Sequence, residues 1–516
     1  MTEGTSNYEK NRRIARNTAF LFFRMLLMMF IGLFTSRVIL QTLGEADYGT
    51  YNAVGGVVSF CAILTVAVSN AVLRFMSYSL GEGDPDKTHR VFSASIIIQA
   101  VICLILAVIV ESAGLWWLHG HMDIPPGRMG AASMALHCSL GILVLNLMSV
   151  PYNAMIISHE KMSAFAVIGI MEALLKLSVA ILLMLSSLDK LKTYSLLMLS
   201  VAVIVRLTYG AYCTRHFSES RGKIVFDKDI VRQMSGFVGW NFFSSGTGVL
   251  TNSGINLMVN KYFGVLVNAA RGVTSQVEGT VKPFAMNFLS ALNPQLTKSY
   301  AEGSKEYSFD LVRKGVKIAS VLLLMVSAPI ILECDYLLDL WLKKVPVYTA
   351  SFVRVTLLCI ILDLGMNSLR QLIIASGRVK VYCLGIGLLN ISSFFATWIA
   401  FSNGASPTTS YIILLILQLL VNVFCLYISN KQEGFPVKSF CTAVVLPIVF
   451  VAIVSIAVPA VFLVFMRPSF LRLVIVSLTS ILLIASLSYT LVLNGNEREF
   501  VLGVIKKYIN RFLGRP

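Results

Sequence analysis

Long apolar runs separated by short polar segments are the main pattern along the chain. Most runs are about 18–25 residues long, the length that a helix needs to cross roughly 30 Å of hydrocarbon. Inside a bilayer every backbone amide must be paired, and the alternating ten-residue segments of a membrane barrel are absent from the sequence, so we expect helices. About 14 transmembrane helices are predicted, at residues 17–41, 51–79, 91–118, 131–157, 163–187, 193–214, 235–259, 265–296, 310–332, 350–376, 380–402, 408–429, 439–466 and 470–493.

A constant offset between two stretches indicates an internal repeat. Leu-Gly at 43–44 aligns with Phe-Gly at 263–264, and Glu-Gly at 82–83 aligns with Glu-Gly at 302–303, in both cases about 220 residues apart. Six spans precede the basic segment 215–234 and six follow it before residue 430. An even number of spans in each half makes the repeats parallel. We therefore predict an all-α polytopic membrane protein with two six-helix bundles, related by a parallel pseudo-repeat, and two further C-terminal helices.

Lysine and arginine are distributed unevenly between the two sides of the membrane. By the predicted boundaries about 26 lie on the side of the N-terminus and about 8 lie opposite, which places both termini in the cytoplasm of a bacterial inner membrane. The tail is interpreted as a basic amphipathic helix on the inner leaflet, or alternatively as a frayed basic end. The expected organisation is a cytoplasmic segment 1–16, an N-terminal bundle 17–214, a basic cytoplasmic linker 215–234, a C-terminal bundle 235–430, two additional helices in 439–493 and the tail 497–516.

Composition narrows the class of protein. Hydrophobic residues make up 56% and charged residues 13% of the 516-residue chain, whereas soluble domains carry about 25% charged residues, so a soluble enzyme is disfavoured. The net charge of +17 is spread between the apolar runs, so no nucleic acid partner is expected. The nine cysteines form no C-x-x-C pair, and the sequence has no Walker phosphate loop. We predict no cofactor, metal site or catalytic residue, and we do not expect an enzyme.

Charged residues inside the predicted spans are the main candidates for function. A charge at the centre of a bilayer costs about 2.5–3.5 kcal/mol on insertion scales, so each one should face a cavity or a partner. Basic residues in the spans outnumber the acids Glu111, Glu172, Glu278 and Asp363 by about 9 to 4. Arginine keeps its proton and presents a fork that fits phosphate oxygens. We therefore expect an anionic ligand that bears phosphate.

In two predicted spans an acidic and a basic residue lie on the same helical face, but farther apart in sequence than the i,i+4 spacing of an ordinary ion pair. Arg271 and Glu278 are seven residues apart, as are Asp363 and Arg370. Seven residues correspond to about 10.5 Å of helical rise. We expect that these partners do not neutralise each other and that they line a water-filled space.

Each intramembrane charge also has a structural interpretation. Glu172 and Lys176 are i,i+4 neighbours that can form an ordinary ion pair. Arginines near the ends of spans can extend their side chains to the membrane interface. This alternative applies to Arg37, Arg74, Arg206 and Arg354.

Several local strings, taken together, resemble a known family. They are residues 36–40 (SRVIL), 43–49 (LGEADYG), 151–154 (PYNA), 159–162 (HEKM), 263–264 (FG), 268–272 (NAARG) and 340–342 (LWL). The chain resembles the Wzx-type polysaccharide flippases of the multidrug/oligosaccharidyl-lipid/polysaccharide (MOP) exporter superfamily. The resemblance covers nearly the whole chain, and the L-G-x-x-x-[FY]-G string is its most specific part.

The resemblance implies alternating access between two bundles. The implied substrate is an undecaprenyl-pyrophosphate-linked oligosaccharide (an O-antigen, capsule or exopolysaccharide repeat unit), moved from the cytoplasmic to the periplasmic leaflet. The implied partners are membrane lipids, a polymerase and a chain-length regulator of the same pathway, and H⁺ or Na⁺ as counter-ion. In related lipid II flippases two extra C-terminal helices form a groove for the lipid tail, and 439–493 resembles these.

The charge pattern and this substrate together give a set of candidate site residues. The expected pyrophosphate ligands are Arg24, Arg74 and Arg271, followed by Arg37, Lys176 and Arg370. Asn70 and Asn256, with Asn252 and Asn287, are expected to meet sugar hydroxyls or to form interhelical hydrogen bonds. The candidates for binding the coupling ion are Glu172, Glu278 and Asp363.

Two other functions remain as alternatives. A cation-coupled multidrug exporter of the same superfamily takes cationic drugs, so its cavity should be acidic, whereas the intramembrane charges here are mostly basic. A membrane glycosyltransferase or polymerase should carry its catalytic acids on a long outside loop, but the longest outside loops predicted here have about 12–17 residues.

Overall fold

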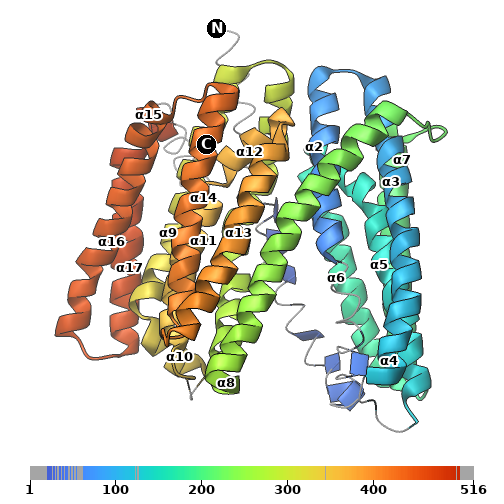
Figure 1. The fold of residues 1–516 in the computed structure, drawn as a ribbon, viewed down its shortest axis with the longest axis horizontal. Coiled ribbons are helices and arrows are strands. Elements are labelled where there is room, and N and C mark those ends of the chain that lie inside the picture. The colour runs from blue at the N-terminus through green and yellow to red at the C-terminus, as the bar shows by residue number, and fades with distance from the viewer. Residues whose placement is uncertain are drawn as a thin grey trace, which may run out of the picture. The chain divides into compact units, whose positions relative to one another are not determined.

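The computed structural model describes residues 62–121, 124, 127–342, 345–495 and 497–499, together with single positions between 20 and 54. Over these residues the chain is helical and contains no strand, as predicted. The first helices (Figure 1) are α2 (Ala62–Glu82), α3 (Pro85–Ile109), α4 (Leu115–His121), α5 (Met129–Ser158), α6 (Met162–Leu185) and α7 (Lys190–His216). They are followed by α8 (Lys228–Ala301), α9 (Lys305–Leu332), α10 (Cys334–Leu342), α11 (Thr349–Gly365), α12 (Asn367–Ser376), α13 (Val379–Ser402), α14 (Thr409–Glu433), α15 (Val437–Phe440), α16 (Leu446–Phe465) and α17 (Phe470–Leu487).

Ten helices in the described part of the chain are long and apolar enough to cross a membrane. They are Pro85–Gly120, Met129–Ser158, Met162–Leu185, Lys190–His216, Lys305–Leu332, Thr349–Ser376, Val379–Ser402, Thr409–Glu433, Val437–Phe465 and Phe470–Val492. Each coincides with one of the 14 predicted spans. Of the other four predictions, 17–41 and 51–79 lie partly outside the described residues, and 235–259 and 265–296 lie in α8.

Helix α8 reverses direction at Gly264. The backbone there is not helical, with φ 79° and ψ −178°, a region that is open essentially to glycine alone. Residues on the two sides of Gly264 pack against each other: Ile255 and Val259 share a buried cluster with Ala270. Along one straight helix, positions 255 and 270 would lie about 22 Å apart. The two spans predicted in this region are therefore two helices that fold back on each other.

The glycines that carry the internal repeat adopt matching backbone conformations. Gly44 and Gly264 have φ of 75° and 79°, and Gly83 and Gly303 have φ of 73° and 76°. Glycine has no Cβ and therefore adopts a positive φ at the lowest cost. The 220-residue offset thus relates helix ends of the same kind, which supports the predicted pseudo-repeat.

The contacts of the chain divide it into two compact units. Unit 1 consists of 1–249, 290–305 and 374–387, and unit 2 consists of 250–289, 306–373 and 388–516. Unit 1 combines the first half of the repeat with three segments of the second half, whereas unit 2 consists only of residues after the linker. The division into bundles at 215–234 remains a prediction.

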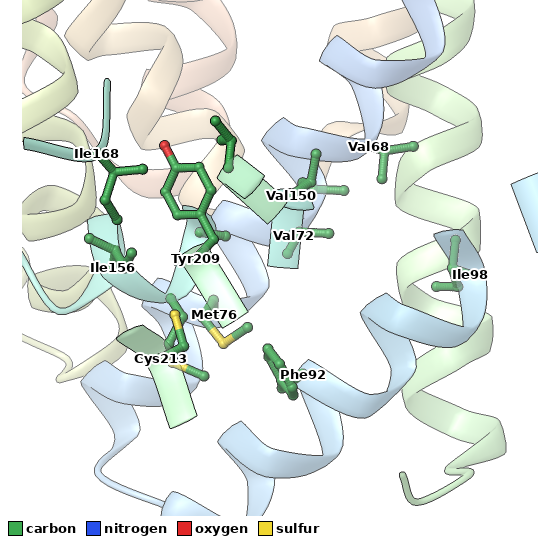
Figure 2. Packing of buried hydrophobic residues seen from close by; sticks show 14 of the residues in the cluster. Val68, Val72, Met76, Phe92, Ile98, Val150, Ile156, Ile168, Tyr209 and Cys213 are labelled. Atoms are coloured by element: carbon green, nitrogen blue, oxygen red, sulfur yellow. The ribbon is translucent and has the colours of Figure 1, made fainter. Parts of the chain in front are cut away.

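A large buried cluster belongs to unit 1. Val68, Val72 and Met76 follow each other at four-residue intervals on α2, so they lie on one face of the helix. Figure 2 shows this row together with Val150 of α5 and Phe92 of α3. This apolar face stabilises the packing of α2 against both helices.

Candidate functional site

A polar cavity of about 240 Å³ lies in unit 2, between the two arms of α8. Five of its lining residues are uncharged and the sixth is an arginine. They are Asn252, Ser253, Asn256, Arg271, Gly272 and Ser275. Asn252 and Arg271 are brought together by the reversal at Gly264, because 19 residues separate them in sequence. Three predicted site residues, Arg271, Asn252 and Asn256, thus line one cavity.

Arg271 is buried without a compensating carboxylate. Its side chain is 8% exposed. One guanidinium nitrogen, Nη2, donates to the backbone oxygen of Asn252 at 3.1 Å and to the side-chain oxygen of the same residue. The other, Nη1, is buried with no hydrogen-bond partner, and the guanidinium carbon lies 5.7 Å from the ring centre of Tyr411. Within the described residues Arg271 forms no ion pair, so the groups in direct contact with its charge are neutral.

Asp363 and Arg370 form a direct ion pair, and the expectation that they do not neutralise each other is wrong. Nη1 of Arg370 lies 2.5 Å from a carboxylate oxygen of Asp363, and Nη2 donates to the backbone oxygen of the same residue. The helix is interrupted at Met366, between α11 and α12. Helical side chains also point towards the N-terminus, so the long arginine reaches back over the seven residues.

The remaining acid in this part of unit 2, Glu278, is also paired. It forms an i,i+4 ion pair with Lys282. Its charge acts on Arg271 and Tyr411 through space. The coupling-ion candidates Glu278 and Asp363 therefore belong to the same unit as the cavity, but each has a basic partner.

Arg24, Glu172 and Lys176 come together in unit 1. The guanidinium of Arg24 lies over the ring of Phe165, 4.4 Å from its centre, and Glu172 acts on it electrostatically. Lys176 pairs with Glu172 at 2.6 Å, as the i,i+4 spacing predicts. The group carries one net positive charge.

Tyr209 of α7 borders this group. It is 5% exposed and belongs to the large apolar cluster of unit 1. Figure 2 shows its hydroxyl oxygen directed away from Met76 and Cys213. Arg24 and Glu172 both act electrostatically on Tyr209. The sequence analysis did not single out this residue, because a tyrosine in an apolar run has no distinguishing signal.

Arg74 binds backbone instead of lining the described cavity. It is 9% exposed, and its Nη2 donates to the carbonyl oxygen of Ala375 at 3.1 Å. The rings of Phe75 and Tyr78 lie 4.5 and 4.8 Å from its guanidinium carbon. The side chain therefore holds the end of α12.

The remaining residues that the sequence analysis named as candidates lie outside the cavity or outside the described residues. Asn70 is exposed on α2, and Arg354 forms an ion pair with Asp335 at 2.7 Å. Arg37 lies outside the described residues, as does most of the predicted amphipathic tail. Among the residues that the structure describes, no three His, Cys, Asp or Glu residues form a group suited to a metal ion.

Two buried ion pairs in unit 2 were missed from the sequence. Arg472 pairs with Glu333 at 2.7 Å, and Lys317 pairs with Glu497 at 2.9 Å. Both pairs connect α9 to the C-terminal hairpin α16–α17 or to the residues after it. The partners of each pair are far apart in sequence, so no spacing predicts the pairing. The sequence shows only that Glu333 and Arg472 lie at the edges of apolar runs.

Comparison with known proteins identifies the type of fold. Residues 21–182 match the MatE family. A MOP superfamily transporter from Pyrococcus furiosus Vc1 (DSM3638), whose structure is described as having a binding pocket of reverse polarity that suggests a different function, superposes with a TM-score of 0.69 at 12% identity over 84% of this chain and 96% of that one. The MATE transporter ClbM in complex with Rb⁺ superposes with a TM-score of 0.67 at 12% identity over 84% and 98%.

One curated relative is similar in sequence. The uncharacterized membrane protein EpsK of Bacillus subtilis (strain 168) is 20% identical over 311 residues, which cover 59% of this chain. The match spans 60% of the length of EpsK. The fold is therefore that of the multi-pass MATE transporters of the MOP superfamily. The solved proteins named above are described as transporters.

Proposed function

We propose that this protein is a flippase that moves an undecaprenyl-pyrophosphate-linked oligosaccharide from the cytoplasmic to the periplasmic leaflet of a bacterial inner membrane. The observation that carries the proposal is the buried guanidinium of Arg271, with its unpartnered Nη1, in a cavity lined by amides and hydroxyls. A buried charge without a partner is costly, so the site is stabilised when an anion binds. Amide and hydroxyl groups of the same cavity suit sugar hydroxyls.

The proposed roles follow the surroundings of each residue. Arg271 binds the pyrophosphate, and Asn256 meets the first sugar. Arg24, in unit 1, is a separate proposed cationic contact for the substrate, since Glu172 is already engaged by Lys176. The pair Asp363–Arg370 is the proposed place where a proton or sodium ion couples to transport, because a cation that binds Asp363 competes with Arg370. The tail of the lipid stays in the bilayer, beside α16 and α17.

The energy for this movement does not require ATP. An anion that moves outward across an inside-negative membrane gains about 2.3 kcal/mol per charge for each 100 mV. A cation that moves inward contributes a similar amount. A polymerase and a chain-length regulator of the same pathway are the proposed partners that use the flipped substrate.

The MATE-like fold also supports a multidrug exporter as the second candidate. Such an exporter needs free carboxylates to bind cationic drugs. Of the four intramembrane acids, Glu172, Glu278 and Asp363 are each paired with lysine or arginine, and Glu111 contacts His137 at 2.9 Å. In the described part of the chain, no acid lines the cavity. The Pyrococcus protein described above has the same fold, and the reverse polarity of its binding pocket is described as suggesting a different function. The charge of the cavity therefore favours the flippase.

Proteoliposomes test the proposal directly. The probe is a fluorescent isoprenyl-pyrophosphate-linked disaccharide, whose transfer between leaflets is followed with a membrane-impermeant quencher. Wild-type protein is expected to flip the probe, and Arg271→Ala is expected to lose at least about 90% of the rate, since hydrogen bonds to a charged group contribute about 1.5–3 kcal/mol. Arg206→Ala is the matched control, because Arg206 lies over Tyr152, 4.1 Å from the ring centre, and not in the cavity. Transport of a cationic dye without movement of the probe would establish the exporter instead.

A further inference from the structure

Gly272 lies inside the second arm of α8, where glycine is an unfavourable residue for a helix. Glycine is usually required at such a position by a positive φ or by a close neighbour. Neither reason applies: Gly272 is not among the residues with positive φ, and no atom of the described residues outside its own turn of helix lies within 4 Å of a Cβ atom added there. The glycine therefore leaves open space, and it lines the polar cavity beside Arg271.

Other glycines of α8 have different surroundings. Gly264 has the positive φ that allows the reversal. A Cβ atom added at Gly254, in the first arm, would lie 2.5 Å from a ring carbon of Phe394, so close packing explains this glycine. Gly279 also leaves open space, but it does not line the cavity. Gly272 differs from all three because the space that it leaves belongs to the cavity.

Polar side chains in the cavity wall have hydrogen-bonding groups that the described part of the chain does not use. Hydroxyl groups inside helices commonly donate to a carbonyl oxygen of the preceding turn, as Thr280 does to Gln276 at 2.9 Å. Ser253 and Ser275 are exposed in the cavity wall and make no such bond, and the amide of Asn256 has no hydrogen-bond partner within the described residues. These groups are therefore available to a polar ligand.

The size of the cavity limits what this ligand can be. Its volume of about 240 Å³ is below the roughly 300–1,000 Å³ of pockets that enclose a drug-sized ligand. One sugar ring beside an anionic group suits this size better than a longer saccharide. A sugar ring carries hydroxyls along its edge and C–H groups on its faces. Its edge therefore matches the serine and asparagine side chains, and one face matches the bare helix backbone at Gly272.

We propose that Gly272 is a specificity-determining residue: the room it leaves admits the sugar ring that is attached to the pyrophosphate, while Ser253, Asn256 and Ser275 bind the hydroxyls of that ring. This inference rests on the proposed function, which supplies the lipid-linked sugar. Arg271 binds the anionic part of the substrate and Gly272 accommodates the sugar. The two adjacent residues thus select different parts of one molecule.

Equilibrium binding to the purified full-length protein in detergent tests this division. Two fluorescent probes share one isoprenyl chain: one ends in a pyrophosphate, and the other carries a disaccharide on the pyrophosphate. The wild type is expected to bind the disaccharide probe more tightly, because only this probe reaches the hydroxyl and amide groups. Gly272→Leu fills the space of the sugar and should weaken binding of the disaccharide probe about tenfold, as expected from the loss of one or two hydrogen bonds. Its Kd for the sugar-free probe should stay unchanged.

Gly279→Leu is the matched control for this variant. Gly279 lies seven residues further along the same helical face, with no atom within 4 Å of an added Cβ and no place in the cavity wall, so both Kd values should stay unchanged. Leucine forms helices better than glycine, and neither variant should lower the melting temperature. A Gly272→Leu protein that binds both probes like the wild type, or that loses affinity for both equally, would overturn the role of Gly272.

Removal of a single hydroxyl gives a second test that inserts no side chain. Ser275→Ala is expected to weaken binding of the disaccharide probe alone, by about two- to tenfold. Thr280→Val is the control, because the hydroxyl of Thr280 already donates to Gln276. Equal affinities of the two variants for the disaccharide probe would contradict the binding of sugar by Ser275.

The flipping assay separates this inference from the proposed function. A wild-type protein that neither binds nor flips the disaccharide probe would reject the flippase, and the sugar site with it. A wild-type protein that flips this probe, together with a Gly272→Leu variant that flips it at the same rate and with the same KM, would reject the role of Gly272 alone.

Discussion

Arg472 donates two hydrogen bonds to Glu333, at 2.8 and 2.7 Å, across 139 residues of sequence. Glu333 is 1% exposed and Arg472 is 8% exposed. A third hydrogen bond joins Arg472 to the backbone oxygen of Met466 at 3.1 Å. The pair attaches the start of α17 to the end of α9, and Lys317–Glu497 makes a second attachment at the other end of the hairpin. The C-terminal hairpin is therefore fixed to unit 2 at two points.

Removing one partner of this pair is expected to destabilise the protein strongly. Arg472→Met leaves the Glu333 carboxylate buried and uncompensated, which costs about 3–5 kcal/mol. The double variant Glu333→Leu with Arg472→Met should recover most of the loss, because no buried charge remains. Thermal unfolding in detergent measures both effects. Arg467→Met, at an exposed arginine five residues earlier, is the control and should leave the melting temperature nearly unchanged.

Gly264 is expected to tolerate no other residue. Gly264→Ala places a Cβ in a backbone conformation that costs about 1–3 kcal/mol for residues other than glycine, at the reversal that forms the cavity. We expect a lower melting temperature and weaker binding of an isoprenyl pyrophosphate. Gly279→Ala lies in the same helix with no atom within 4 Å of its added Cβ, and alanine is the better helix former. It should be neutral or slightly stabilising; equal losses in the two variants would show that the reversal is not the cause.

Variants of the Asp363–Arg370 ion pair can distinguish a structural role of the pair from a role in coupling transport to an ion gradient. Asp363→Asn leaves Arg370 without its carboxylate, and both the melting temperature and the transport rate should fall. Adding Arg370→Gln should restore the melting temperature, because the unpaired charge is gone. If Asp363 also binds the coupling ion, transport by the double variant stays insensitive to a pH or sodium gradient. Gradient-driven transport by the double variant at the wild-type rate would reject Asp363 as the coupling site.

An ion-pair network in unit 1 predicts a dependence of stability on pH. Arg128 bonds to Asp47 and lies 2.7 Å from Asp189. Burial raises the pKa of Asp189, but the Lys192 amide and the charge of Arg128 outweigh this effect and hold the pKa below its usual value. The network therefore contributes its full stability above the unfolded pKa of about 3.9 and loses it as the pH falls through the lower folded pKa.

Melting temperatures measured over a pH series check this sign. Wild type should be more stable than Asp189→Asn at pH 7, and the difference should shrink only below about pH 4. A difference that stays constant down to pH 2.5 would show that the carboxylate charge does not contribute. Asp229→Asn, at a carboxylate outside this network in the first turn of α8, is the control.

Most of the membrane topology could be predicted because it follows from local properties of the chain. Ten predicted spans coincide with helices that meet the length and hydropathy of a membrane span, since burying a run of apolar side chains in lipid needs no distant partner. The repeat was visible at residues 44 and 264, because both have a positive φ, which glycine adopts at the lowest cost. The i,i+4 pair Glu172–Lys176 was predicted for the same local reason.

The sequence by itself determined that the chain is an all-helical membrane protein with an internal repeat and an excess of buried cations. Only the tertiary structure decided which cation remains available. Arg74 donates to Ala375, Arg370 pairs with Asp363 and Lys176 pairs with Glu172. Arg271 lines the polar cavity and has a buried nitrogen without a hydrogen-bond partner. The physical reason is that the partner of a charged side chain is set by the reversals and breaks of the helices, as at Gly264 and Met366, and these bring together groups that no spacing along a straight helix relates.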